Sequence, residues 1–136
     1  MHELALADAV VTSALAAAER EQLREVTRIA VRIGELQQID KDVFKFALEQ
    51  VMPSGEPRLA GTSFTLETVP ARFRCRACNR GFTRSETGGS LGKEEAEAIH
   101  FLPELAHAFL RCPGCDSGDF AVQDGRGVSI AYIEGE

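Results

Sequence analysis

The sequence predicts an α+β protein in which a small three-stranded sheet with two helices is interrupted by an inserted four-cysteine domain. Helical and strand periodicities alternate along the first half of the 136-residue sequence. Two C-x-x-C pairs lie in the second half, and an apolar strand pattern follows them. We therefore expect a discontinuous α/β domain of residues 1–70 and 127–136, with the four-cysteine domain at residues 71–126.

The first half of the sequence predicts two helices with a strand between them. Leu4–Glu21 is rich in alanine, and its apolar side chains recur at near-helical spacing. In Val26–Leu36, apolar and polar residues alternate, which is the period of a strand with one apolar face. Asp40 is a typical N-cap for a helix at Lys41–Val51. The apolar side expected for this helix carries Val43, Phe44, Ala47, Leu48 and Val51.

Two more strands complete the predicted sheet. Thr62–Ala71 has strand character, with Phe64, Leu66 and Val69 expected to point inward. Val128–Ile133 is too apolar to stay exposed, so we expect it to return to the sheet of the first domain. The predicted order is helix, strand, helix, strand, four-cysteine insert and strand, with both helices on one face of the sheet.

The cysteines form two knuckles with matching surroundings: Cys75 with Cys78, and Cys112 with Cys115. A Phe-Arg pair precedes the first knuckle and a Leu-Arg pair the second, and a glycine and a phenylalanine follow each. Two C-x-x-C pairs with no cysteine left over are typical of one tetrahedral zinc site. We predict a pseudo-twofold zinc ribbon in which Gly81 and Gly114 adopt positive φ at the turns. Four thiolate ligands leave no position for a substrate, so the zinc is expected to be structural.

Disulfides and a redox-active dithiol are the alternative interpretations of these cysteines. The sequence begins without an apolar signal segment and has no stretch that could span a membrane, so we expect a cytoplasmic protein with reduced thiols. A redox dithiol would account for one C-x-x-C pair, but not for two pairs in matched surroundings.

The composition disfavours binding to nucleic acid. The sequence has 15 Lys and Arg against 21 Asp and Glu, a net charge of −6, one tyrosine and no tryptophan. Nucleic-acid binding needs a basic face, and stacking on bases needs aromatic side chains. A zinc-ribbon adaptor or a nucleic-acid-binding module remains the alternative class of function, and the charge counts against the second.

The segment between the knuckles is long, with 33 residues at positions 79–111. A ribbon needs only about a dozen there. We expect a flexible loop at Ser85–Gly92 and a short helix at Lys93–Glu97. An apolar run follows, and local packing on the ribbon is a better explanation for it than a partner surface. Its members include Ile99, Phe101, Leu102 and Leu105.

The opening tripeptide Met1, His2 and Glu3 has metal-binding character. The bulky second residue disfavours removal of Met1, so its free amine should be retained. The predicted helix begins near Leu4, and backbone amides in a first turn have no intrahelical acceptor. An amine, an imidazole and deprotonated amides can enclose one ion in fused rings, which suits Ni(II) or Cu(II). Glu3 can add a carboxylate or support another ligand, and the alternative is a solvated, frayed terminus.

Taken together, these features resemble the HypA family of nickel metallochaperones for [NiFe]-hydrogenase maturation. The resemblance rests on the opening tripeptide, on Gly34-Glu35-Leu36 and on the paired knuckles, and it covers the whole length. It implies a carrier rather than an enzyme, with a nickel-binding α/β domain, an inserted zinc domain, and Ni(II) and Zn(II) as its metals.

The resemblance also implies roles for residues and partners. His2 matches the nickel ligand of the family, and the amine of Met1 with the backbone around His2 and Glu3 matches the rest of that site. The four cysteines match the zinc ligands. The implied partners are a HypB-type GTPase and the hydrogenase large-subunit precursor, without nucleic acid or membrane. Some members also serve urease, and the sequence leaves both the client and a homodimer open.

The long insert resembles archaeal-type members, which carry an Ile-His-Phe-x-Pro-Glu run that matches Ile99–Glu104 here. His100 is therefore a candidate additional nickel ligand. An equally weighted alternative is that His100 caps a packed loop. We expect His107, inside the apolar run, to serve packing rather than metal binding.

Overall fold

The computed structural model describes residues 2–51, 53–87, 93–102 and 105–136, with the side chains of residues 93, 96 and 100 left out of the description. The chain forms two compact units. The first unit contains Met1–Arg32, Ile39–Glu67 and Val128–Glu136. The second unit contains Ile33–Gln38 and Thr68–Gly127. An α+β fold is confirmed, and each unit contains or borders one three-stranded sheet.

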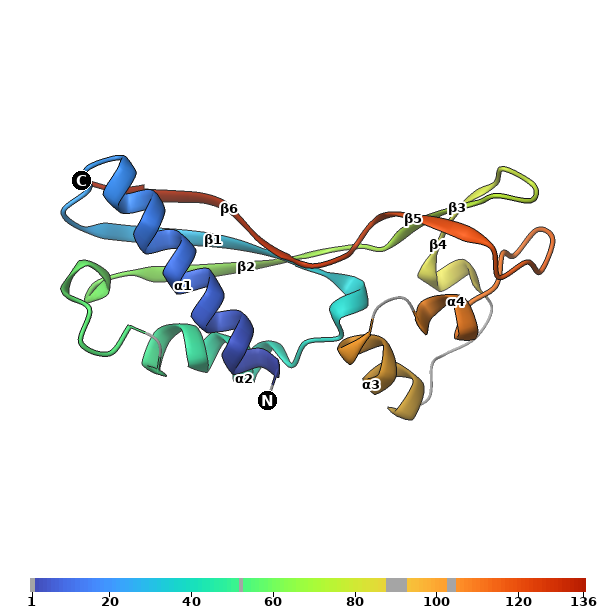
Figure 1. The fold of residues 1–136 in the computed structure, drawn as a ribbon, viewed down its shortest axis with the longest axis horizontal. Helices are drawn as coiled ribbons and strands as arrows, with labels where there is room; N and C mark the ends of the chain where they lie inside the picture. Colours follow the sequence, from blue (N-terminus) through green and yellow to red (C-terminus); the bar gives the residue numbers. More distant parts are fainter. Residues whose placement is uncertain (1, 52, 88–92, 103–104) are drawn as a thin grey trace. The chain divides into compact units, whose positions relative to one another are not determined.

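The sheet of the first unit has the strand order β2-β1-β6, with β1 at Val26–Gly34, β2 at Ser63–Val69 and β6 at Val128–Gly135. Thr62 donates a hydrogen bond to the carbonyl of Val26 at 2.6 Å, which places the starts of β1 and β2 together. These two strands are therefore parallel. The last strand does return to this sheet, as the sequence predicts, and it pairs with the central strand β1 (Figure 1).

Two helices accompany this sheet. Helix α1 spans His2–Arg20, so it begins two residues before the predicted Leu4, and it packs against β6 and α2 (Figure 1). Helix α2 spans Lys41–Phe46 and continues as a π-helical turn at Ala47–Val51. The predicted N-cap is confirmed, because Oδ1 of Asp40 accepts hydrogen bonds from the two amides at positions 42 and 43, at 3.1 and 3.2 Å.

The core of the first unit follows most of the predicted periodicities, although Leu4 is 37% exposed and Leu66 and Val69 are only half-buried. Ile29 and Val31 are buried on β1, and Phe64 is buried on β2. In the second helix, the inward side chains are the fully buried Phe44, Ala47 and Leu48. Val43 is 42% exposed and Val51 is 40% exposed, against prediction. The π-helical turn is wider than an α-helical turn, so it rotates Val51 away from the face that carries Phe44.

The second unit is built on a three-stranded antiparallel sheet of order β4-β3-β5. Its strands are β3 at Arg72–Cys75, β4 at Gly81–Thr83 and β5 at Phe120–Asp124. Two helices lie between β4 and β5 in sequence: α3 at Lys93–Phe101 and α4 at Ala106–Phe109. Helix α3 is longer than the predicted Lys93–Glu97. Residues 85–87 belong to a 3-10 helix, and residues 88–92 of the predicted loop lie outside the described residues.

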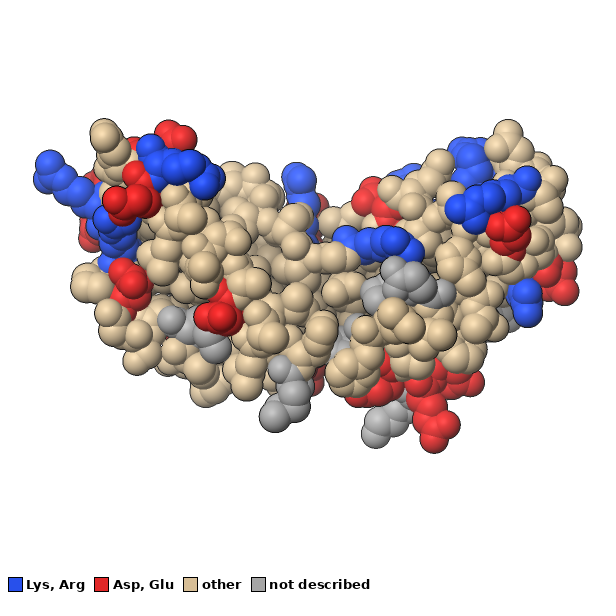
Figure 2. Space-filling model, in the orientation of Figure 1, with Lys and Arg blue, Asp and Glu red and all other residues tan. Residues whose placement is uncertain are grey.

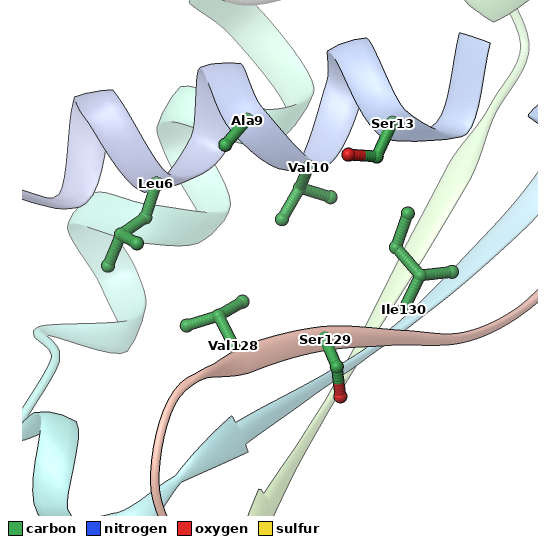
Figure 3. Close-up of a pocket in the computed structure, with 7 residues that line it drawn as sticks. All are labelled: Leu6, Ala9, Val10, Ser13, Val128, Ser129 and Ile130. Atoms are coloured by element: carbon green, nitrogen blue, oxygen red, sulfur yellow. The ribbon is translucent and has the colours of Figure 1, made fainter. Parts of the chain in front are cut away.

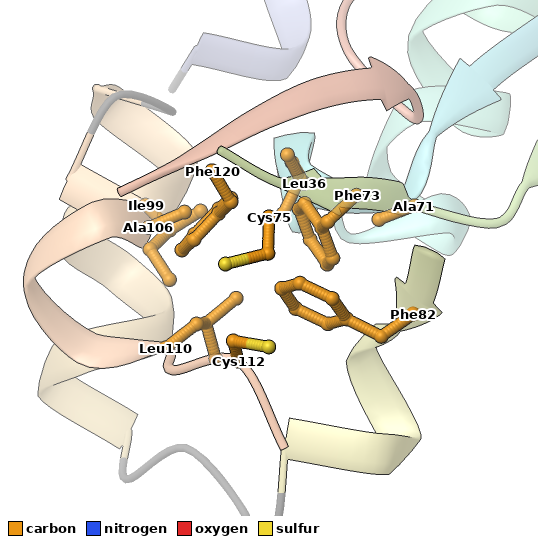
Figure 4. Close-up of a cluster of buried hydrophobic side chains, with 10 residues drawn as sticks. All are labelled: Leu36, Ala71, Phe73, Cys75, Phe82, Ile99, Ala106, Leu110, Cys112 and Phe120. Atoms are coloured by element: carbon orange, nitrogen blue, oxygen red, sulfur yellow. The ribbon is translucent and has the colours of Figure 1, made fainter. Parts of the chain in front are cut away.

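The core of the second unit is aromatic and includes two of the cysteines (Figure 4). The rings of Phe73, Phe82 and Phe120 have centroids 5.0 to 5.5 Å apart. Ile99 from α3 is fully buried in this cluster, and Leu105 packs against it, so local packing of the apolar run is confirmed for these two residues. The remaining members of the cluster are Leu36, Ala71, Cys75, Ala106, Leu110 and Cys112.

One of these residues, Leu36, comes from the end of the first long strand pattern. The sequence places Leu36 in that strand, but β1 ends at Gly34 and Glu35–Gln37 forms a 3-10 helix. The amide of Leu36 donates to the carbonyl of Gly125 at 3.0 Å. A side chain at Gly34 would overlap that same carbonyl, so only glycine permits this close backbone approach. Leu36 is thereby held inside the aromatic core.

Within the described residues, no helix combines the length and apolar character needed to cross a membrane.

Candidate zinc centre and N-terminal residues

The two cysteine knuckles have the same backbone geometry. In each, the amide of the first cysteine donates to the carbonyl five residues later, and its carbonyl accepts from the amide four residues later. The two distances are 2.9 and 3.0 Å for Cys75, and 2.9 and 2.8 Å for Cys112. The predicted pseudo-twofold relation therefore holds at the knuckles. It does not extend to the flanking elements, because β3 precedes the first knuckle while α4 precedes the second.

The positive φ angles of these turns occur at residues other than those expected. Asn79 and Asp116, each immediately after the second cysteine of its knuckle, both have φ of 63°. Gly81 and Gly114, which the sequence analysis selects for this role, do not have positive φ. Asn and Asp tolerate the left-handed region because their short polar side chains can bond locally. The signal that identifies them is an Asn or Asp directly after each C-x-x-C pair.

Backbone amides point at the sulfur atoms. The amide of Cys78 donates to Sγ of Cys75 at 3.5 Å, and the amide of Gly114 donates to Sγ of Cys112 at 3.4 Å. Such donors favour a thiolate over a thiol because they stabilise negative charge on sulfur. Each knuckle therefore prepares its first cysteine to bind a cation.

The four sulfur atoms are brought together as predicted. All lie within 4.8 Å of one another, and the two closest pairs are Cys75–Cys115 at 3.5 Å and Cys78–Cys112 at 3.6 Å. A tetrahedral site with Zn–S bonds of about 2.3 Å has sulfur atoms about 3.8 Å apart. The cluster fits Zn(II), and the four cysteines are free of disulfides. Among the described residues it is the one cluster of this kind.

Burial and an ion pair hold the cluster in place. The first cysteine of each knuckle, Cys75 or Cys112, is buried, and the second, Cys78 or Cys115, is exposed. Arg76, in the first knuckle, binds to Asp119 in the segment that follows the second knuckle. Its Nη1 donates to the carboxylate of Asp119 at 2.8 Å, and its amide donates to the carbonyl of Asp119 at 3.0 Å. This contact joins the two halves of the centre.

The thiols of the metal-free centre cannot all ionise together. Amide donation within the first knuckle, chiefly from Cys78, lowers the pKa of Cys75 to about 7. For Cys115, the amide of Ser117 acts to lower the pKa. Hydrogen bonds to the other three cysteines, first Cys75, together with partial desolvation of the sulfur, outweigh that effect and raise the pKa to about 12. One thiolate forms readily, and a metal ion must displace protons from the others.

The other predicted site residues lie in different places. His2 is half-buried and Glu3 is only 7% exposed, both in the first turn of α1 in the first unit. Met1 lies outside the described residues. The backbone of His100 belongs to α3, and its side chain is not among those described.

The structure supports the packing role expected of His107. Its ring centroid lies 4.3 Å from that of Phe120, and Nδ1 is 3.3 Å from the carbonyl oxygen of Gly118. The imidazole therefore extends the aromatic core of the second unit and is half-buried there.

A shallow pocket in the first unit offers no comparable chemistry. It has a volume of about 210 Å³ and lies between α1 and β6 (Figure 3). Its lining provides two hydroxyl groups and otherwise apolar side chains: Leu6, Ala9, Val10, Ser13, Val128, Ser129 and Ile130. Such a surface lacks imidazole, thiolate and carboxylate ligands, so it is not a metal site.

Comparison with known proteins agrees with this site. The model of one family, described as "Hydrogenase/urease nickel incorporation, metallochaperone, hypA", matches residues 1–135. The chain is 43% identical over 134 residues to the hydrogenase maturation factor HypA of Thermococcus kodakarensis, with 98% of this chain and 95% of that protein covered. It is 42% identical over 133 residues to the HypA of Thermococcus gammatolerans, with 98% and 94% covered.

A solved structure shares the fold. The solution structure of the nickel metallochaperone HypA from Helicobacter pylori aligns with a TM-score of 0.62 over 98% of this chain and 96% of that one, at 16% sequence identity. A family match over nearly the whole chain, together with a four-cysteine centre that fits zinc, establishes the relationship. The chain belongs to the HypA family of nickel metallochaperones, which are hydrogenase maturation factors and not enzymes, and it carries the four-cysteine zinc site.

Proposed function

We propose that the chain carries Ni(II) at its N-terminus. The ligands are the amine of Met1, the imidazole of His2, and amide nitrogens at His2 and Glu3. The start of α1 at His2 is the observation that carries this proposal. Amides in the first turn of a helix donate no hydrogen bond within the helix, so losing a proton to a metal there breaks none of the helix's own hydrogen bonds. The resulting anionic nitrogen set offsets the repulsion between the helix dipole and a cation.

Glu3 supports this site through its position. Glu3 adjoins His2 in the sequence, and it is only 7% exposed. We assign it to the nickel site, either as a ligand or as a group that orients the imidazole of His2. Nickel must displace protons from the amine, the imidazole and the amides, so its affinity should fall as pH falls.

The two metals are separated by ligand chemistry. Four thiolates hold Zn(II) in the second unit, while a nitrogen-rich set in the first unit suits Ni(II). Zinc therefore stays as a structural ion, and nickel binds with fast release. We propose that nickel passes to a hydrogenase large-subunit precursor with the help of a HypB-type GTPase, and that urease is a second possible client. We also propose that the protein acts in the cytoplasm, where cysteines such as these four stay reduced.

Metal content after nickel loading and desalting tests the nickel site. The untagged wild type should hold about one zinc and gain about one nickel per chain, while His2→Ala should keep its zinc and gain no nickel. His107→Phe is the matched control, because it replaces the packing histidine by another aromatic ring and should load nickel like the wild type. His100→Ala tests the candidate additional ligand and should weaken loading less than His2→Ala.

Equal nickel in wild type and His2→Ala would show that the site lies elsewhere. If the wild type takes up no nickel while its zinc remains, the chain instead acts as a zinc-stabilised adaptor between maturation proteins.

A further inference from the structure

Helix α3, at Lys93–Phe101 in the second unit, has an outward face that the zinc and nickel sites do not use. Its inward face is defined by Ile99, which is fully buried in the aromatic core. On an α-helix, the residues five before, two before and two after a given residue lie on nearly the opposite side of the helix. Opposite Ile99 these positions are Glu97, Glu94 and Phe101, with i, i+3 and i+7 spacing. All three are exposed, whereas Glu95, nearer the core side, is half-buried.

This face combines apolar surface with negative charge. Phe101 is 57% exposed, and Leu102, just beyond the helix, is 50% exposed. Two large apolar side chains, consecutive in the sequence, are therefore exposed at the C-terminal end of α3. In Figure 2, acidic side chains gather over the place of α3. The α3 sequence supplies three glutamates against one lysine, so its side chains carry a net negative charge, histidine being counted as neutral.

We infer that the outward face of α3, formed by Glu94, Glu97 and Phe101, together with the exposed Leu102 that follows the helix, docks a basic amphipathic segment of another protein. In this arrangement, apolar side chains of the partner cover Phe101 and Leu102. Lysines or arginines flanking those side chains pair with Glu94 and Glu97. Complementary charge mainly raises the association rate and selects the partner, while the apolar contact slows dissociation.

Charge decides between the candidate occupants. A second copy of this chain would bring the same glutamates to a twofold interface, where like charges oppose each other. Nucleic acid and anionic membranes are also negative and would be repelled by Glu94 and Glu97. A basic protein segment satisfies both the apolar patch and the negative charge. This inference does not depend on which residues bind nickel.

Two synthetic peptides provide the test. One is a short amphipathic peptide with leucine on one face and lysine on the other, and its control has glutamate in place of each lysine. Titrated into the zinc-loaded full chain, the lysine peptide should shift the amide NMR signals of α3, and the glutamate peptide should not. The double variant E94K/E97K should weaken binding of the lysine peptide by about tenfold or more.

The E94K/E97K variant should also bind the glutamate peptide better than the wild type does. A variant with a damaged fold would not gain this binding, so the gain reports on charge. Glu134→Lys is the matched control, because it reverses an exposed acidic residue of the first unit and should leave binding unchanged. Phe101→Ala should weaken binding of the lysine peptide, because it removes part of the apolar contact. Zinc content checks that each variant is folded.

Three outcomes would overturn the inference. The lysine peptide fails to bind, or shifts signals away from α3. E94K/E97K binds it as the wild type does. The α3 signals move with protein concentration alone, which would mean that a second copy covers this face.

Discussion

Replacing Phe120 by alanine should weaken zinc binding, although Phe120 is not a zinc ligand. Its side chain is fully buried, with ring centroids 5.0 Å from Phe73, 5.5 Å from Phe82 and 4.3 Å from His107. Removing a buried phenylalanine side chain costs about 3–5 kcal/mol. Phe120 also pairs directly with Cys75 between β5 and β3, so the core and the zinc centre share one sheet.

The expected size follows from the coupling of metal binding to folding. If the second unit is unfolded without zinc, zinc binding must also provide the free energy of folding. Folding stability lost through Phe120→Ala is then subtracted from the free energy of zinc binding. Each 1.4 kcal/mol is tenfold in the dissociation constant, so 3–5 kcal/mol raises the zinc dissociation constant by about two to three and a half decades at most. Competition with a chromophoric chelator at constant pH measures this constant directly.

Phe44→Ala is the matched control, because Phe44 is equally buried but belongs to the first unit. It should lower the thermal stability of the first unit and leave zinc affinity unchanged. The reasoning fails if Phe120→Ala binds zinc like the wild type, or if Phe44→Ala weakens zinc binding by as much.

Three further predictions concern the zinc centre and the close backbone approach at Gly34. At about pH 8, zinc binding should release the proton of Cys115, whose pKa is about 12, but almost none from Cys75, whose pKa is about 7. Below about pH 7, Cys75 contributes a proton too, so zinc affinity should fall more steeply with falling pH, as calorimetry in different buffers can count. Asn79→Ala should lower the free energy of unfolding by about 1 kcal/mol, because Asn79 has a φ of 63° that alanine adopts only with strain. Asn79→Gly should not, because glycine adopts positive φ readily, and thermal unfolding of the zinc-loaded protein measures both. Gly34→Ala should destabilise by several kcal/mol in the same assay because its new methyl group meets a backbone carbonyl, whereas Gly61→Ala, with open space around it, should be tolerated.

The zinc centre could be predicted because its signal is local. Two cysteines three residues apart place their sulfur atoms in one turn, and a pair of such turns requires only that the chain bring them together. Assigning positive φ to Gly81 and Gly114 was wrong because glycine is permissive in many contexts, and permissiveness does not show where a turn needs it. Asn79 and Asp116 occupy that conformation, and their positions directly after each knuckle were the better guide.

The fold could be predicted where a periodic pattern extends over many residues. The prediction failed where tertiary contacts determine the backbone conformation. The central strand and its buried Ile29 and Val31 follow from alternation. The end of that strand does not, because Leu36 continues the apolar pattern while its backbone turns into a 3-10 helix. The run after Lys93 divides similarly, with Ile99 buried and Phe101 exposed, and apolar character alone cannot tell which side chain faces the core.

The placement of Leu36 limits how far the zinc-binding part can be treated as a cassette. Its side chain fills the core of the second unit, and the carboxylate of its neighbour Glu35 accepts a hydrogen bond from the amide of Ala71 at 2.9 Å. A gene fragment covering residues 68–127 encodes every zinc ligand but omits both contributions. Recombination that moves only this fragment into another protein would transfer the metal-binding motif with an incomplete interior. The six residues from Ile33 to Gln38 must travel with it.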